Sequence, residues 1–165
     1  MLGRYKAGFS LMIQIKAPNS YAQYKAKKKI FLAGSIEMGT AEDWQEQVTK
    51  ALADLDVVIL NPRRVAWDPT WVQSKDNPLF REQVEWELQG LEDADLVLVY
   101  FHPATRAPIT LLELGLFGDS KPDKLLVCCP EGYWRKGNVD IVCERYGIRY
   151  TDNLDALVAL VRESI

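Results

Sequence analysis

The sequence predicts an α/β fold in which a doubly wound sheet of five parallel strands, flavodoxin-like or Rossmann-like, is covered by helices. Short apolar runs alternate along the chain with longer segments whose apolar residues recur at helical spacing. This alternation is typical of βα units around a parallel sheet. The runs are apolar throughout, as expected for strands that are buried on both faces.

Each element follows from this pattern. The predicted strands, of which the last is the weakest, are Ile30–Ala33, Val57–Leu60, Leu96–Tyr100, Leu125–Cys129 and Ile148–Tyr150. The predicted helices lie at about Ala41–Asp54, Leu79–Asp93, Ile109–Ser120, Val139–Tyr146 and Leu154–Ser164. Thr40 followed by Asp43 resembles a capping signal for the first helix.

Residues 1–28 are predicted to form an N-terminal extension in front of one α/β domain that spans residues 29–165. Within the extension, Ser10–Lys16 is a candidate for an additional edge strand, whereas Asn19–Lys29 is polar and rich in lysine. A chain of 165 residues with 48% apolar residues suits one domain with a continuous core. One functional site is therefore expected rather than several modules.

Charge and apolar content point to a small molecule as the binding partner. The net charge of −3 and the pI near 5.3 give no electrostatic reason to expect a nucleic-acid polymer or an anionic membrane. No stretch of about 18 apolar residues occurs, and the first residues do not resemble a cleavable secretion signal. We therefore expect a cytoplasmic protein.

Disulfides and transition-metal sites are not expected. Of three cysteines, Cys128 and Cys129 are neighbours in a predicted strand, so their side chains point to opposite faces. His102 is the single histidine and no CxxC spacing occurs, which leaves almost no ligands for zinc or iron. We expect chemistry that needs no cofactor.

The loop after the first predicted strand is one candidate binding segment, because ligands of doubly wound sheets bind outside the carboxyl ends of the strands. The segment Gly34–Gly39 contains Ser35 and has little side-chain bulk. Its backbone N–H groups are therefore candidates for holding a phosphate or a sugar hydroxyl, with a plain βα turn as the alternative. The loop is neither GxGxxG nor a P-loop, which removes the usual support for NAD or ATP binding.

The loop after the second predicted strand is a candidate site for a planar base. Asn61 and Arg63 begin this loop, and Trp67 and Trp71 follow. Amide, guanidinium and aromatic groups together can hydrogen-bond and stack on a base. Structural packing of the tryptophans explains the pattern equally well.

Two glutamates near apolar helix faces are the candidate catalytic residues. Glu113 is the one charged residue of Pro108–Gly118, where a carboxylate is costly unless it is paired, used or turned to water. Glu87 borders the apolar stripe of its helix, with pairing to Arg81 as the structural alternative. Two carboxylates about 5 Å apart serve retaining glycosyl transfer, one as nucleophile and one as acid.

From about Lys29 to Tyr146 the chain resembles the nucleoside 2-deoxyribosyltransferases and the related deoxynucleoside monophosphate N-glycosidases. The resemblance rests on Phe31–Ile36, on Glu87–Tyr100 and on Leu112–Gly115, in this order and spacing. It implies a flavodoxin-like fold and an enzyme that acts on N-glycosidic bonds.

The resemblance also implies roles for single residues. The family's nucleophile is the glutamate of an ELG motif, which falls on Glu113. Its second acid lies eight residues before the aspartate that opens the next strand, which leads from Asp95 to Glu87. The transferases have an aspartate there that helps to protonate the base, so a glutamate lengthens the reach by one methylene.

An asparagine from a neighbouring subunit contacts the sugar in this family, and Asn138 is its best match. A homo-oligomer with a shared active site is therefore expected. Two positions depart from the family, because Phe31 stands where a tyrosine is common and Ala107 where an aspartate or serine is common. The missing sugar contacts would then come from Ser35, Thr105 or Thr110.

The resemblance and the two glutamates together predict a nucleoside 2-deoxyribosyltransferase that uses 2′-deoxynucleosides and free nucleobases. Glu113 attacks C1′ while Glu87 protonates the leaving base, and a second base then captures the covalent deoxyribosyl-enzyme. Trp67, Trp71 and also Trp44 are candidates for shaping the base pocket.

Two alternatives remain open at this point. The first is a hydrolase of deoxynucleoside 5′-monophosphates, with its phosphate held by Ser35 and the Gly34–Gly39 loop, although Glu37 in that loop would repel a phosphate. The second is a non-catalytic nucleotide-binding module, which would have no need for an acid such as Glu113 in an apolar helix.

Overall fold

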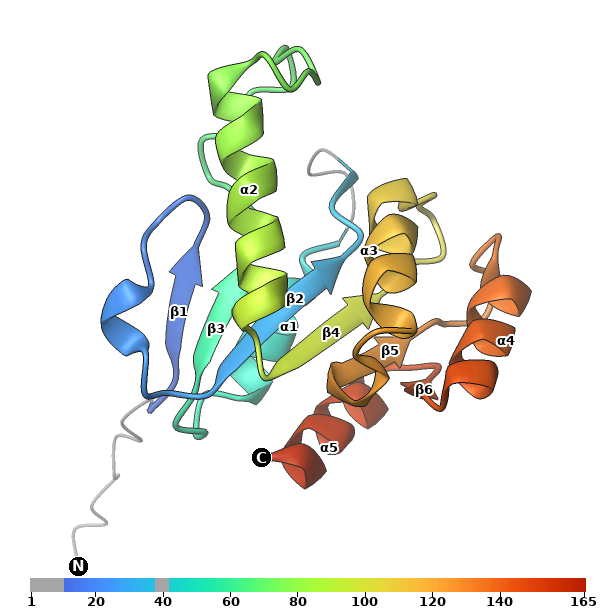
Figure 1. The fold of residues 1–165 in the computed structure, drawn as a ribbon. Coiled ribbons are helices and arrows are strands. Elements are labelled where there is room, and N and C mark those ends of the chain that lie inside the picture. Colours follow the sequence, from blue (N-terminus) through green and yellow to red (C-terminus); the bar gives the residue numbers. More distant parts are fainter. Residues whose placement is uncertain (1–10, 38–41) are drawn as a thin grey trace, which may run out of the picture.

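The computed structural model describes residues 11–37 and 42–165, and these residues form one sheet of six parallel strands between two layers of helices (Figure 1). The sheet order is β1-β3-β2-β4-β5-β6. The strands are β1 (Ile13–Lys16), β2 (Lys29–Gly34), β3 (Val58–Asn61), β4 (Leu96–Tyr100), β5 (Leu125–Cys128) and β6 (Arg149–Thr151).

The strand order confirms the predicted fold class. Without β1, the order of the five remaining strands is the 2-1-3-4-5 order of flavodoxin-like sheets. β1 is the additional N-terminal edge strand, and it pairs in parallel with β3 so that Ile13 lies opposite Val58. Part of the predicted N-terminal extension therefore completes the sheet.

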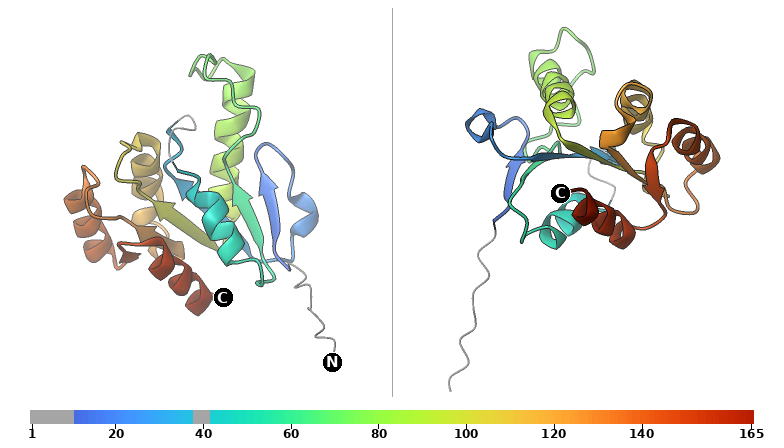
Figure 2. Two further views of the ribbon diagram at one scale, coloured as in Figure 1. Left: turned by 180° about the vertical axis from the view of Figure 1, so that it is seen from behind. Right: turned by 60° about the horizontal axis from the view of Figure 1, so that its bottom comes forward.

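The helices cover both faces, as a doubly wound sheet requires. α2, α3 and α4 lie on one face and α1 and α5 on the other (Figure 2). Their bounds are α1 (Trp44–Ala51), α2 (Pro78–Asp93), α3 (Pro108–Gly118), α4 (Lys136–Tyr146) and α5 (Leu154–Ser164). Among the described residues, no helix is both long and apolar enough to cross a membrane.

The first helix is shorter than the sequence predicted. Its N-cap is Asp43, whose carboxylate accepts a hydrogen bond from the Glu46 amide at 3.1 Å. α1 therefore starts at Trp44 rather than at Ala41, and Thr40 and Ala41 lie outside the described residues. The helix also ends at Ala51, three residues before the predicted Asp54.

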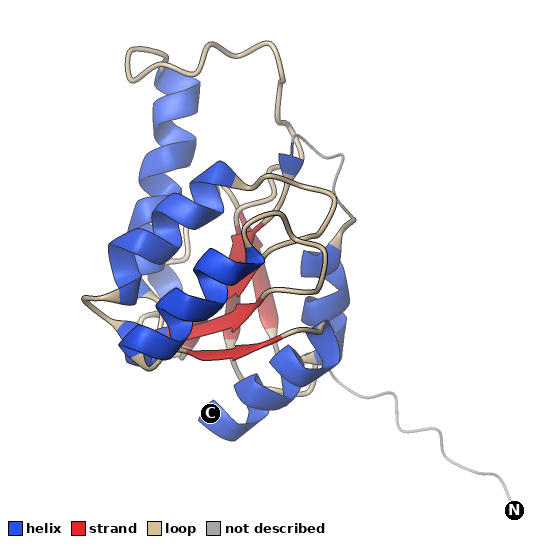
Figure 3. Cartoon of the chain, turned by 90° about the vertical axis from the view of Figure 1, so that its right-hand side faces the viewer, coloured by secondary structure: helices blue, strands red, loops and turns tan. Residues whose placement is uncertain are grey.

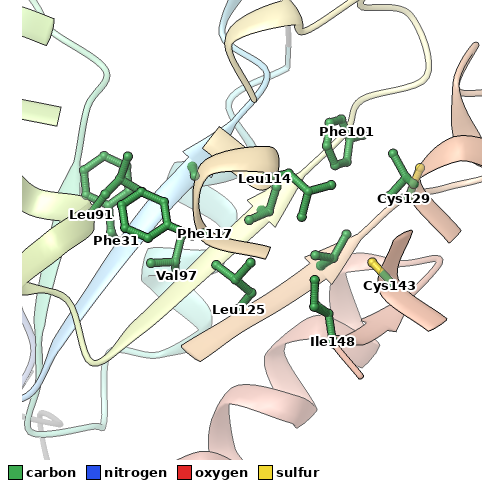
Figure 4. Close-up of a cluster of buried hydrophobic side chains, with 14 of the residues drawn as sticks. Phe31, Leu91, Val97, Phe101, Leu114, Phe117, Leu125, Cys129, Cys143 and Ile148 are labelled. Atoms are coloured by element: carbon green, nitrogen blue, oxygen red, sulfur yellow. The ribbon is translucent and has the colours of Figure 1, made fainter. Parts of the chain in front are cut away.

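Two apolar clusters sandwich the sheet, because successive strand residues point to opposite faces. The cluster beneath α2, α3 and α4 contains Phe31, Leu91, Leu114 and Phe117 (Figure 4). The other cluster joins α1 and α5 to the opposite face. Cys128, Cys129 and Cys143 are buried free thiols, which agrees with the expectation of no disulfides.

Two glycines permit close contacts that position the helices. A Cβ atom at Gly90 of α2 would lie 2.8 Å from the Phe31 ring of β2. A Cβ atom at Gly34 would lie 2.6 Å from Cζ2 of Trp44 and 2.7 Å from the Tyr100 carbonyl oxygen. Substitution at Gly90 therefore requires a shift of α2, and substitution at Gly34 requires a shift of the β2–α1 connection.

The carboxyl ends of β2, β3 and β4 converge on one edge of the sheet. A long loop runs from β3 to the N-terminus of α2, and a shorter one runs from β4 to the N-terminus of α3 (Figure 3). The strand order reverses between β2 and β4, which is the position where ligands bind in such sheets.

Candidate active site

Glu113 points to the core-facing side of α3. The residues Thr110, Leu114 and Phe117 of this helix are buried, and Glu113 falls in the same stripe at helical spacing. It is partly buried, whereas Ile109, Leu112 and Leu116 of the same helix are exposed. The alternative that Glu113 is a solvent-exposed charge on the outer face of its helix is therefore wrong.

Glu87 occupies the equivalent stripe of α2, the neighbouring helix on the same face (Figure 1). Gln83, Gly90 and Leu91 are the buried residues of α2, and Glu87 lies between them and is partly buried. The predicted structural alternative, a pair with Arg81, does not occur, because Arg81 donates to Glu85 instead at 2.6 Å.

The two carboxyl groups interact electrostatically. Burial, together with the charge of Glu87, raises the pKa of Glu113 to about 8. Burial also raises the pKa of Glu87 to about 7, against a hydrogen bond from Gln83 that lowers it. Since like charges disfavour double ionisation, we expect the pair to hold one proton near neutral pH. One acid and one carboxylate are then present together.

This arrangement has a consequence for stability. The pKa of Glu113 rises from 4.5 to about 8 on folding, so the folded protein holds this proton more tightly than the unfolded chain. Stability is therefore present at low pH and is lost as the pH rises through that window. We expect Glu113→Gln to raise the unfolding free energy at alkaline pH by on the order of 2 kcal/mol, discounted for partial exposure.

The measurement is denaturant unfolding of the wild type and of Glu113→Gln at about pH 5 and about pH 9. Most of the pH range between the unfolded and folded pKa values of Glu113 lies between these two conditions. The stabilisation should be larger at the alkaline pH and small at the acid one. An equal effect at both values would mean that the Glu113 carboxyl is not held in its neutral form.

Gln83 connects Glu87 to the loop after β3. Its side chain is 4% exposed, and its Nε2 donates to the Pro62 carbonyl oxygen at 2.9 Å and to Glu87 Oε1 at 2.8 Å. This amide therefore fixes one oxygen of the second carboxyl. The sequence alone did not single out Gln83, because its bond to Pro62 depends on tertiary structure.

Ser35 joins the loops after β2 and β4 through hydrogen bonds. It is 1% exposed, and its Oγ accepts the His102 amide at 3.0 Å and lies 2.7 Å from Thr105 Oγ1. The Ser35 carbonyl accepts from Trp44 Nε1 at 3.1 Å. These contacts give Ser35 and Gly34 a structural function in holding the site, beside the substrate contact that the sequence predicted.

Glu37 closes the start of α3. Its Oε1 accepts hydrogen bonds from the backbone amides of Arg106 at 3.0 Å and Ala107 at 2.9 Å. Both Glu37 and Ala107 have positive φ, at 43° and 45°. A carboxylate thus occupies the N-terminal region of the helix that carries Glu113, where an anion is favoured.

The polar groups of Asn61 and Arg63 make contacts within the protein. Asn61 is 1% exposed, and its Oδ1 accepts from the Arg63 amide at 3.0 Å. The Arg63 guanidinium lies 3.6 Å from the carboxylate of Asp43, the N-cap of α1. Both residues lie at the carboxyl edge, but these contacts serve the β3 loop and α1.

The tryptophans of the β3–α2 loop pack together. Trp67 and Trp71 are partly buried, with ring centroids 5.0 Å apart at 64°, and the Arg64 guanidinium lies 5.1 Å from the Trp71 ring. Trp44 is different, because it is fully buried beneath the opposite face of the sheet. The expectation that Trp44 shapes a base pocket is therefore wrong.

Asn138 lies on a different helix from each of the two glutamates. It is exposed on α4, the helix that packs beside α3 on the same face. Thr105 and Thr110 are buried, and Thr105 Oγ1 donates to the His102 carbonyl at 2.9 Å. Phe31 is fully buried on the α2 face and brings no hydroxyl group there.

The fold and the paired acids define an α/β protein with two interacting carboxyl groups on α2 and α3, the helices that pack against β2 and β4 of a flavodoxin-like sheet. A family model described as nucleoside 2-deoxyribosyltransferase like matches residues 27–133. The chain therefore belongs to this family, as its motifs predicted, and no curated protein matches it.

A solved structure supports the fold. It is described as a conserved protein from Enterococcus faecalis V583, and it superposes with a TM-score of 0.58 at 12% identity. The match covers 85% of this chain and 100% of the other. At this identity the likeness concerns the fold alone.

Proposed function

We propose that this protein transfers 2-deoxyribose between nucleobases through a covalent intermediate on Glu113. The observation that carries the proposal is the pair formed by Glu113 and Glu87, whose pKa values are raised and whose charges interact. Family membership supports the substrate class, because the family is nucleoside 2-deoxyribosyltransferase like.

The proposed reaction is a double displacement. A carboxylate oxygen of Glu113 attacks C1′ of a 2′-deoxynucleoside, and the electron pair of the broken C1′–N bond passes to the base. Glu87 supplies the proton that makes this base a neutral leaving group. A nitrogen of a second base then attacks C1′ and displaces Glu113, Glu87 takes a proton back, and two inversions restore the anomer.

The test is base exchange, followed by chromatography of 2′-deoxyinosine with free adenine beside a sample without adenine. Transferase activity would give 2′-deoxyadenosine and hypoxanthine, with little free sugar. Free deoxyribose in both samples would instead identify a hydrolase with water as acceptor. If neither this donor nor a pyrimidine donor reacts, 5′-monophosphates become the next donors to test, and inactivity with those as well would contradict the proposal.

An unphosphorylated nucleoside is the proposed donor, and Glu37 supports this choice. Its carboxylate bonds to the backbone at the start of α3, roughly 9 Å along the helix from Glu113. A 5′-phosphate on a sugar held at Glu113 would approach this negative charge. Of the predicted Gly34–Gly39 segment, residues 34–37 are described and Met38 and Gly39 lie outside the described residues. We propose that the described part of this segment serves a nucleoside rather than a monophosphate.

Glu37→Gln tests this selectivity, since a glutamine oxygen can still accept the two backbone hydrogen bonds. We expect wild-type kcat/KM to favour the nucleoside over its 5′-monophosphate by at least about 10-fold, and the variant to lose most of this preference. Glu46→Gln, which changes an exposed glutamate paired with Lys50, is the matched control. A preference that survives in Glu37→Gln would assign selectivity to another group.

A homo-oligomer is proposed as the active form, and the outer face of α3 supports it. Ile109, Leu112 and Leu116 of this face are 58%, 58% and 50% exposed, which leaves an apolar stripe on the surface. Gly115 lies in the same helix, and a Cβ atom there would meet nothing within 4 Å. No contact within one subunit requires a glycine at this position of the helix. A glycine there would allow a second subunit to approach the helix backbone closely.

Leu112→Glu is expected to convert the oligomer to monomers in light scattering and to reduce base exchange in parallel. A charge in an apolar interface leaves an uncompensated desolvation cost, so association weakens. Leu11→Glu, at another exposed apolar residue, is the control. Monomers that keep full activity would contradict a shared site.

If Asn138 completes that site, a mixture of Asn138→Ala and Glu113→Gln subunits should regain activity that neither has alone.

A further inference from the structure

Gln83 carries an unsatisfied acceptor beside the proposed acid. Its side chain is 4% exposed, yet its Oε1 has no hydrogen-bond partner among the described residues. The Nε2 of the same amide donates to the Pro62 carbonyl and to Glu87 Oε1. A buried acceptor without a donor is costly, so a group that supplies an N–H or O–H at this point would be favoured.

The orientation of this amide is determined by its neighbours. The Pro62 carbonyl oxygen can only accept a hydrogen bond, so it requires the amide nitrogen of Gln83 on its side. Rotating the amide by half a turn would place Gln83 Oε1 against this carbonyl and against a Glu87 oxygen. The acceptor therefore stays where it is, next to the carboxyl of Glu87.

We propose that Gln83 Oε1 accepts a hydrogen bond from the exocyclic amino group of the base that Glu87 protonates, so that the enzyme prefers 6-aminopurines to 6-oxopurines. The inference rests on the proposed function, and it makes Gln83 a specificity-determining residue. Gln83 Oε1 would recognise the amino group of the base, while Gln83 Nε2 positions the carboxyl group of Glu87.

The edge of a 6-aminopurine carries a donor and an acceptor that are complementary to this pair of groups. Its N7 is an acceptor that the protonated Glu87 can reach, and its N6 amino group beside N7 is a donor for Gln83 Oε1. The proton moves from Glu87 to N7 as the C1′–N9 bond breaks, and the base leaves as a neutral N7-protonated tautomer. A 6-oxopurine presents O6 in place of the amino group, so two acceptors would face each other.

Three donors that differ at C6 test the assignment, namely 2′-deoxyadenosine, 2′-deoxyinosine, which also carries a hydrogen on N1, and the unsubstituted purine 2′-deoxyribonucleoside. Wild-type kcat/KM is expected to favour deoxyadenosine over deoxyinosine by about 10- to 100-fold, with the unsubstituted donor between them. Gln83→Met, which removes both amide atoms at similar length, should bring the ratio to within about threefold. Because Gln83 also holds Glu87, all three rates should fall, and the ratio is the decisive quantity.

Gln89→Met is the matched control. Gln89 lies on the same helix and donates to Asp93 four residues later at 3.0 Å, but it is exposed. It should leave the rates and the ratio unchanged, and thermal unfolding of both variants checks the fold.

The outcomes separate this inference from the proposed function. Turnover of all three donors without a C6 preference, or a preference that Gln83→Met retains, overturns the role of Gln83 and leaves the transferase intact. If no donor reacts, the proposed function fails, and calorimetry of free adenine and hypoxanthine decides the recognition alone. Adenine bound about 10-fold more tightly by wild type but not by Gln83→Met supports it, and equal or undetectable binding overturns it.

Discussion

Glu113→Gln is expected to abolish base exchange, lowering kcat by about 10⁴-fold or more, as loss of a covalent nucleophile does in other enzymes. The amide keeps the size of the side chain but has no oxygen that can form an ester with C1′. The raised pKa of Glu113 means that only part of the protein carries the reactive carboxylate at neutral pH, and the amide of the variant has no such form at any pH. Chromatographic base exchange with an excess of acceptor measures the loss.

Two further observations distinguish a nucleophile from a residue that only supports the site. Mass spectrometry of wild-type protein quenched with a donor but no acceptor should find an added deoxyribosyl group, which Glu113→Gln should lack. Asp119→Asn changes the acid at the C-terminal end of the same helix and should keep both exchange and labelling. Substantial exchange by Glu113→Gln would rule out the covalent mechanism.

The fold was largely predictable because both faces of the sheet are covered. A strand such as Leu96–Tyr100 is buried along its whole length, so its apolar run reports its position directly. Helix boundaries were less predictable where a local side chain decides them. Asp43 caps α1 and moves its start to Trp44, whereas the sequence offered Thr40 as an equally good capping residue.

The candidate site was predictable in its charged groups and less so in its polar ones. Glu113 and Glu87 stand out because a carboxylate in an apolar stripe is unusual in any fold. Trp44 was misplaced because an aromatic residue near a loop looks the same in a pocket and in a core. The partners of Gln83 and Glu37 come from other loops, Pro62 and Ala107, so no local pattern reveals them.

The second acid, Glu87, has the other large expected effect. Glu87→Gln should lower kcat for base exchange by about 10²- to 10⁴-fold, the range of general acid catalysis, while the protein still forms the site. The loss should depend on the leaving group. 5-Fluoro-2′-deoxyuridine releases a less basic pyrimidine than 2′-deoxyuridine and needs less proton help, so its rate should fall less. Glu85→Gln, an exposed neighbour on α2, is the control.

The pH dependence of kcat gives an independent test of the same role. Glu113 must be ionised and Glu87 protonated, so activity requires the singly protonated pair and should fall on both sides of an optimum. The pKa of Glu87 is raised to about 7 and that of Glu113 to about 8, so the acid fall is expected near the lower value and the alkaline fall near the higher one. The reactive form, with the proton on Glu87, is then the minor form of the singly protonated pair. Glu87→Gln should remove this alkaline fall and keep the acid one, because only Glu113 then titrates. An alkaline limb that persists in the variant would assign proton donation to another group, and Glu87→Asp, which keeps an acid, should retain it.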